Sequence, residues 1–173
     1  ARATFFLIGQ QIAGNEDVLR RMVAEGHQIG NHTYSHAILE DASDHAIVEE
    51  IHKTEVLLTD VLGPGTYWLR PPYGMVDRSR TALIKTPMIF WSLDPEDWKV
   101  VNAEQVADTI LSSVQPGDII LLHDFYPTSV EAALQVIDAL QPQGYVFVTV
   151  EELFALYGTV PLLGELYCNA TTI

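Results

Sequence analysis

Gly30-Asn31-His32-Thr33-Tyr34-Ser35-His36 is the stretch around which the rest of the chain is arranged. It follows a short apolar segment and places two histidines four residues apart in a polar turn. Neutral imidazoles at this spacing can converge on one divalent metal ion, and zinc is an ion that imidazole binds well. Two histidines that only form hydrogen bonds in a loop would give the same pattern. Taken alone, the stretch therefore leaves both interpretations open.

Three further polar motifs lie along the chain, and each follows or closes an apolar segment of β type. They are Arg70-Pro71-Pro72-Tyr73-Gly74, the segment from Trp91 to Trp98, and Leu121-Leu122-His123-Asp124. In α/β barrels and doubly wound sheets, functional loops gather at the C-terminal ends of parallel strands. We therefore expect these motifs and the histidine pair to share one end of a sheet.

The rest of the sequence alternates between short apolar segments and amphipathic segments of helical period. Strands are predicted at residues 3–8, 27–30, 67–69, 88–93, 118–122 and 145–148. Helices are predicted at residues 15–25, 43–62, 77–85, 102–114, 129–140 and 151–157, with Asn15 and Asn102 as N-caps. This alternation predicts an α/β fold, a parallel sheet covered by helices. The pattern does not choose between a barrel and an open sheet.

The composition describes one globular domain with an acidic surface. A chain of 173 residues, 48% of them hydrophobic, can bury a core. The formal net charge is −14, and nine Lys and Arg residues cannot form a surface that follows phosphate groups. We therefore expect no nucleic-acid partner and no membrane partner. Cys168 is the single cysteine, and whether it is paired stays open.

In this order, the four motifs resemble those of the polysaccharide deacetylases, the family-4 carbohydrate esterases with a NodB homology domain. The resemblance covers almost the whole chain, with residues 1–160 as the domain and residues 161–173 as a C-terminal tail. It implies an irregular, incomplete (β/α) barrel, and so decides between a barrel and an open sheet. It also implies a protein that is secreted or extracellular, at the cell wall.

The resemblance implies that His32 and His36 bind a divalent metal, with zinc as the first expectation and cobalt or a similar ion as an alternative. In the family, a Thr-Phe-Asp-Asp-Gly-Pro-like motif on the first strand supplies the third ligand and the catalytic base. That motif is absent from this sequence. Asp41 and Asp44 follow His36 closely, but acidic residues are ordinary at a helix start. We therefore expect the first strand to be missing and an N-terminal segment carrying the Asp-Asp motif to supply it.

The remaining motif residues would form the acid side of the site and the acetyl pocket. The resemblance implies that His123 is the general acid and that Asp97 tunes its imidazole. The other expected residues are Arg70, which orients the base, Tyr73, whose backbone N–H stabilises an oxyanion and which also contacts substrate, and Trp91 and Leu121 as pocket walls. If Arg70 is buried, an acidic group should face it, because an unpaired buried charge is costly.

The implied activity is metal-assisted hydrolysis of N-acetyl groups on a polysaccharide or oligosaccharide of N-acetylglucosamine type, such as chitin or peptidoglycan. Two alternatives stay open. One is an acetylxylan esterase, and the other is an inactive, truncated pseudoenzyme that binds glycan without hydrolysing it. The missing Asp-Asp motif is the feature that separates the enzyme from the pseudoenzyme.

Overall fold

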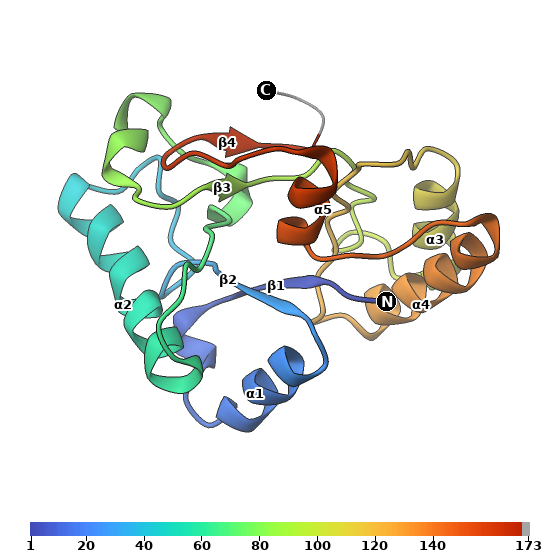
Figure 1. Ribbon diagram of the computed structural model, residues 1–173, viewed down its shortest axis with the longest axis horizontal. Helices are drawn as coiled ribbons and strands as arrows, with labels where there is room; N and C mark the ends of the chain where they lie inside the picture. The colour runs from blue at the N-terminus through green and yellow to red at the C-terminus, as the bar shows by residue number, and fades with distance from the viewer. Residues whose placement is uncertain (171–173) are drawn as a thin grey trace.

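The computed structural model describes residues 1–170, in which strands and helices alternate along the chain (Figure 1). The strands are β1 (Thr4–Leu7), β2 (Gln28–Asn31), β3 (Met88–Ile89) and β4 (Leu166–Tyr167). The α-helices are α1 (Glu16–Ala24), α2 (Asp44–Leu62), α3 (Ala103–Leu111), α4 (Pro127–Leu140) and α5 (Val150–Tyr157). Four short 3-10 helices connect them: η1 (Gly9–Gln11), η2 (Pro72–Gly74), η3 (Arg78–Leu83) and η4 (Gln141–Gln143).

The β segments form a curved row of parallel neighbours. β1 pairs with β2, and β3 pairs with β4, both in parallel. Single parallel bridges extend the row, namely Asn31 with Leu69, Leu69 with Met88, and Leu93 with Ile120. Figure 1 shows α2 on one side of this row and α3 with α4 on the other. Because these segments run in parallel, the loops that carry the four motifs lie together at the C-terminal end of the row.

Helix ends follow from local side-chain chemistry in some places and depart from it in others. Ser43 caps α2 by accepting a hydrogen bond from Ala46 N–H (3.2 Å). Asn102 caps α3 as predicted, accepting from Gln105 N–H (2.9 Å). Asn15 was predicted to cap α1, but its amide instead donates to the Gln11 carbonyl (2.8 Å). The prediction for Asn15 is therefore wrong in its bonding, although α1 starts directly after it.

The core is divided among four apolar clusters that attach the helices to the sheet. The largest joins α3 and α4, and its buried members include Val106, Ile110, Ala132 and Val136. Other clusters attach α5 through Phe154, and α2 through Ile47 and Leu58. The helices thereby fix the positions of the β segments, and with them the loops at their ends.

Several predicted elements are shorter than expected or of another type. β3 ends at Ile89 instead of Leu93. Residues 67–69 and 118–122 form isolated β-bridges instead of continuous strands. Residues 145–148 form no strand, since their one backbone bond to the sheet is Arg2 N–H to Phe147 C=O (3.2 Å). The helix predicted at 77–85 is the 3-10 helix η3, which starts on the Asp77 side chain and lacks an apolar stripe. A strand requires a bonded neighbour along its length, and a sequence pattern does not supply one.

The described part of the predicted tail packs against the body. β4 lies within it and pairs with β3. Tyr167 is buried, and its ring lies 5.2 Å from that of Phe154 on α5. The last three residues of the predicted tail, 171–173, lie outside the described residues. Across residues 1–170, no helix has both the length and the apolar character needed to cross a membrane.

Candidate active site

The His32–His36 turn lies at the C-terminal end of β2. His32 N–H donates to the Leu7 carbonyl (2.9 Å), so the end of β1 holds the start of the turn. His32 Nδ1 lies 2.6 Å from the Arg70 carbonyl oxygen, and this contact requires a proton on Nδ1. Nε2 of His32 is therefore the nitrogen with a free lone pair. The rings of His32 and His36 meet edge to face with centroids 4.8 Å apart.

Both imidazoles are held in the neutral form that a metal ligand needs. Burial lowers the pKa of His32 to about 4, although its bond to the Arg70 carbonyl acts in the opposite direction. Burial also lowers the pKa of His36, and His123 adds to this effect. Two neutral imidazoles with free nitrogens suit a divalent ion as part of its ligand set.

The chain supplies only these two ligands in its described part. Within residues 1–170, no His, Cys, Asp or Glu side chains gather in a group of three that could hold a metal. Asp41 is exposed, and the Asp44 carboxylate faces Arg80 instead (3.6 Å). The residues present therefore fit part of a metal site, and neither acid after His36 completes it.

Arg70 is buried, with 8% of its surface exposed. Its Nε donates to Ile89 C=O (3.1 Å) and its Nη2 to Phe90 C=O (3.0 Å), while Cζ lies 4.3 Å from the Phe6 ring centroid. Among the described residues, 1–170, no acidic side chain forms an ion pair with Arg70. Burial lowers its pKa to about 10, which leaves it charged at pH 7. The acidic group expected to face a buried Arg70 is thus not among the described residues, where two carbonyls and an aromatic face take its place.

Tyr73 and Trp91 lie beside the histidines and Arg70. Tyr73 has a left-handed backbone (φ 60°, ψ 5°), and its ring lies 4.7 Å from that of His36. Within residues 1–170 its backbone N–H donates to no protein group. The Trp91 ring centroid lies 5.9 Å from Arg70 Cζ. A Cβ built on Gly74 would lie 3.0 Å from Cη2 of the same ring. The structure therefore brings Tyr73, Trp91, Arg70 and the histidine pair together.

Leu121 is buried and follows the bridge at Ile120. Its N–H donates to the Leu93 carbonyl (2.9 Å), which places it in the row next to the segment that carries Trp91. Its role as a wall of an acetyl pocket stays a prediction.

Asp97 and His123 form a tightly held pair. His123 N–H donates to Asp97 Oδ2 (2.7 Å), and His123 Nδ1 lies 2.8 Å from Asp97 Oδ1. The Asp97 side chain is 0% exposed, whereas that of His123 is 35% exposed. The hydrogen bond that His123 donates to Asp97 raises the pKa of His123, with burial acting against it. Because Nδ1 is bonded to Asp97 and the side chain is partly exposed, Nε2 of His123 is the nitrogen left to donate a proton, as a general acid requires.

Ser129, near the start of α4, was not singled out by the sequence. Burial alone would raise the pKa of Asp97, but hydrogen bonds from His123 keep that pKa below its ordinary value, and the nearby Ser129 hydroxyl acts in the same direction. Ser129 is buried, and its Oγ has no hydrogen bond of normal geometry. Its position two residues into a helix resembles an ordinary capping position, so no sequence signal distinguishes it.

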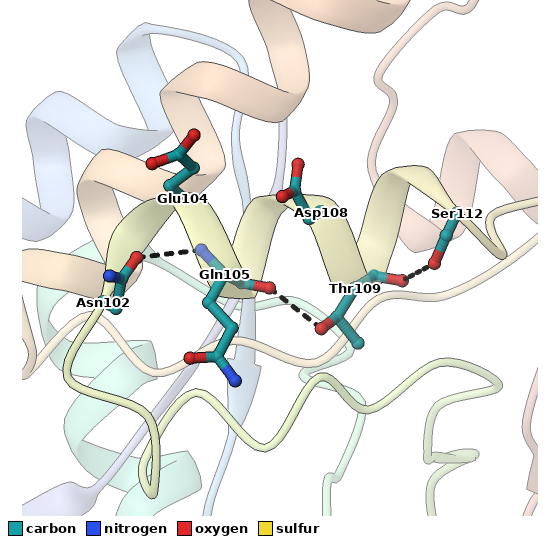
Figure 2. Close-up of a pocket in the computed structure, with 6 residues that line it drawn as sticks. All are labelled: Asn102, Glu104, Gln105, Asp108, Thr109 and Ser112. Atoms are coloured by element: carbon teal, nitrogen blue, oxygen red, sulfur yellow. Dashed lines mark hydrogen bonds between the residues drawn. The ribbon is translucent and has the colours of Figure 1, made fainter.

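A polar hollow on the exposed side of α3 lies elsewhere (Figure 2). It is lined by Asn102, Glu104, Gln105, Asp108, Thr109 and Ser112. Figure 2 shows the side chains of Asn102, Thr109 and Ser112 bonding to the backbone of their own helix, as in Thr109 Oγ1 to Gln105 C=O (2.9 Å). No predicted site residue lines the hollow, and we assign the candidate site to the strand ends instead.

Comparison with known proteins identifies the family of the chain. The sequence model of the polysaccharide deacetylase family matches residues 1–87. The peptidoglycan-N-acetylglucosamine deacetylase PgdA of Listeria monocytogenes is 36% identical over 170 residues, which are 98% of this chain and 36% of PgdA. The chain thus spans about a third of the length of this curated relative.

Two solved structures resemble this chain in fold, an esterase and a pseudoenzyme. A family 4 acetyl xylan esterase from Clostridium thermocellum, in complex with a cobalt ion, has a TM-score of 0.92 and 31% identity, covering 99% of this chain and 86% of the other. A family 4 pseudoenzyme from Bacillus anthracis, BA3943, has a TM-score of 0.81 and 26% identity, covering 88% and 55%. These likenesses confirm the predicted incomplete α/β barrel.

Proposed function

Because the chain belongs to the polysaccharide deacetylase family, we propose that it hydrolyses N-acetyl groups on a glycan of N-acetylglucosamine type, in peptidoglycan or chitin. The observation that carries this proposal is the Asp97–His123 pair, with both carboxylate oxygens bonded to His123. Hydrolysis of an amide needs a proton on the departing nitrogen, since an amine anion is a very poor leaving group. An imidazolium with a raised pKa, open on one side, supplies that proton.

The other site residues have roles that follow from their contacts. His32 and His36 would hold a divalent ion, zinc by first expectation, and such an ion would activate a water and polarise the acetyl carbonyl. The free N–H of Tyr73 is available to the oxyanion that forms on that carbonyl. Trp91 offers an aromatic wall to the acetyl methyl group. When the C–N bond breaks, His123 protonates the nitrogen and acetate is released.

The base of this reaction would come from a carboxylate beside Arg70. Arg70 is buried, charged at pH 7 and without a carboxylate partner among residues 1–170. A buried charge of this kind is stabilised by an ion pair with good hydrogen bonds. We infer that an N-terminal strand segment carrying an Asp-Asp motif packs beside β1 and provides both this carboxylate and the third metal ligand.

The substrate and its location follow from the same proposal. The name of PgdA supports peptidoglycan, and that of the Clostridium thermocellum relative supports acetylxylan as the alternative. Both substrates lie outside the cytoplasmic membrane, so we propose that the protein acts outside the cell or at the cell wall. A glycan-binding pseudoenzyme is the second candidate, favoured by the absence of a carboxylate near Arg70 in the described residues.

Acetate release tests the proposal. The zinc-loaded chain, alone and extended by a strand segment with two aspartates, is incubated with N-acetylglucosamine oligomers, peptidoglycan and acetylxylan. We expect the extended chain to release acetate from at least the first two substrates. His123→Ala should abolish this release. His52→Ala should not, because His52 is an exposed histidine on α2. Folded, zinc-loaded protein that binds glycan but releases no acetate would replace the enzyme with the pseudoenzyme.

A further inference from the structure

The turn that carries the two candidate ligands is held in an unfavourable backbone conformation. Thr33 has φ 62° and His36 has φ 63°, in the left-handed region that favours glycine. Thr33 is β-branched and fully buried, and its Oγ1 has no hydrogen-bond partner. A conformation of this kind persists only where the surrounding structure enforces it. The contacts that enforce it here are therefore of functional interest.

Glu50, on α2, provides three of these contacts. Its Oε2 accepts hydrogen bonds from Tyr34 N–H (3.0 Å) and Ser35 N–H (2.8 Å). Its Oε1 accepts from the Ser35 hydroxyl (2.9 Å). The two amide groups belong to the residues between Thr33 and His36. A single carboxylate thus fixes the middle of the turn through charge-assisted bonds, which are stronger than neutral ones.

Asn31 links the start of the turn to the neighbouring residue of α2. Its Oδ1 accepts from Thr33 N–H (2.9 Å), and its Nδ2 donates to Ile51 C=O (2.9 Å). Two consecutive residues of α2, Glu50 and Ile51, therefore accept the hydrogen bonds that link the turn to this helix. Asn31 holds the residue before Tyr34. Gln10 N–H of η1 donates to the Tyr34 carbonyl (2.9 Å), and Glu50 provides the side-chain bonds to Tyr34 and Ser35, the residues that lead into His36.

The two histidines depend on these contacts to different degrees. His32 is also anchored by its Nδ1 contact with Arg70 C=O and by its N–H bond to Leu7. His36 makes no side-chain hydrogen bond within residues 1–170, and only ring contacts with His32 and Tyr73 locate it. The position of the His36 imidazole is therefore set mainly by the turn backbone, in which Glu50 binds the N–H groups of Tyr34 and Ser35 and Gln10 binds the Tyr34 carbonyl.

We propose that Glu50 is a positioning residue for the divalent-metal site, and that it sets the metal affinity of the histidine pair by holding His36 in reach of the ion. This inference rests on the proposed metal binding at His32 and His36. The sequence did not indicate it, because Glu50 lies within the helix predicted at residues 43–62 and outside the four motifs. Supporting groups around metal ligands typically change metal affinity by about 10–100-fold when they are removed.

Zinc titration into the full chain, followed by calorimetry, tests the inference. We expect Glu50→Ala to weaken zinc binding by about 10–100-fold. Glu50→Gln should weaken it less, because one amide oxygen can still accept from both backbone N–H groups. Glu49→Ala is the matched control, since Glu49 lies one residue away, faces His45 and Lys53, and touches nothing in the turn. Its zinc affinity should equal that of the parent.

A second readout separates positioning from general stability. Amide exchange at Tyr34 and Ser35 should become faster in Glu50→Ala, while exchange in the α3 core stays slow. If Glu50→Ala does not fold, Ser35→Ala decides the matter, because it removes only the bond to Oε1 and leaves the fold; it should bind zinc more weakly than the parent.

Three results would overturn the inference. The first is a zinc affinity of folded Glu50→Ala within about twofold of that of the parent, where a loss of about 10-fold or more is expected. The second is an equal loss of zinc affinity in Glu49→Ala. The third is a parent protein that binds no zinc. Zinc binding that depends on Glu50 in a protein that releases no acetate would remove the proposed activity and leave this inference standing.

Discussion

At the scale of single residues, one carboxylate sets the protonation state of the candidate general acid. Asp97 is buried and bonded to His123 twice, so solvent screens its effect on the imidazole only in part. The contact raises the pKa of His123 above its ordinary value of 6.5. The imidazolium therefore persists at a higher pH than in a free histidine, which suits a group that must donate a proton near neutrality.

We predict that Asp97→Asn lowers the pKa of His123, measured by NMR titration of its ring. Asp94→Asn should lower it less, since Asp94 acts on His123 only through its charge. Stability should follow. The raised pKa of His123 contributes stability that is fully present below 6.5 and is lost as pH rises through the raised value. The lowered pKa of Asp97 contributes stability that is present above 3.8 and is lost as pH falls through the lowered value.

The stability difference between the parent and Asp97→Asn should therefore be largest between pH 3.8 and 6.5. Urea unfolding across the pH range measures it. A His123 pKa that does not change in Asp97→Asn would contradict the pairing.

A second prediction separates the acid role of His123 from a structural one. General acid catalysis contributes about 10²–10⁴-fold, and most where the leaving group is basic. His123→Ala should therefore reduce acetate release from an N-acetyl sugar by about that factor, but reduce hydrolysis of 4-nitrophenyl acetate much less, because its phenolate leaves without a proton. Equal losses on both substrates would indicate damage to the site as a whole.

The sequence pointed to those candidate site residues whose signal is local. Each of these residues belongs to a short motif after an expected strand, and the structure places them at the C-terminal end of the parallel row. They are His32, His36, Arg70 and His123. Glu50 reaches the turn from a helix, so no local signal marks it. A contact between distant segments leaves no periodicity in either one, which is why the supporting groups of the site escaped prediction.

At the scale of elements, β2 depends on a glycine inside the strand. A Cβ on Gly30 would lie 2.4 Å from Phe6 Cδ1 and 2.9 Å from the Trp68 carbonyl oxygen. We predict that Gly30→Ala lowers the free energy of unfolding by about 1–3 kcal/mol, because the added methyl forces neighbours apart in a packed interior. Chemical denaturation measures the change. Gly65→Ala is the control, since its nearest neighbour would lie at 3.7 Å, and an equal loss there would contradict the argument.

Element type was more predictable than element length. Apolar segments located the parallel row correctly, because burial on both faces requires such segments. Strand lengths failed where the neighbour was absent or brief, as at 145–148 and after Ile89. β4 was missed because a segment of two residues is too short to carry a strand signal, and only their pairing with β3 creates the strand.

At the scale of the whole molecule, the sheet is open beside β1. β1 bonds to β2 along one edge, and near its other edge the described residues give one backbone bond, Arg2 N–H to Phe147 C=O. Unpaired strand edges promote association with other chains. We predict that the 173-residue chain self-associates, measured by light scattering after size exclusion. A stable, monodisperse monomer would show that this edge is protected without a further strand.

The open edge and the unpaired Arg70 lead to the last prediction. Phe6 of β1 packs against the Arg70 guanidinium, so a strand added beside β1 would end next to that charge. A chain extended by a strand segment with two aspartates should release acetate about 10²–10⁴-fold faster than the chain without it, the contribution expected of a positioned base. The gain should disappear in His36→Ala and in a matched segment with both aspartates changed to asparagine. If the aspartate segment raises zinc affinity and removes self-association but leaves acetate release unchanged, the carboxylate beside Arg70 serves the fold and not the reaction.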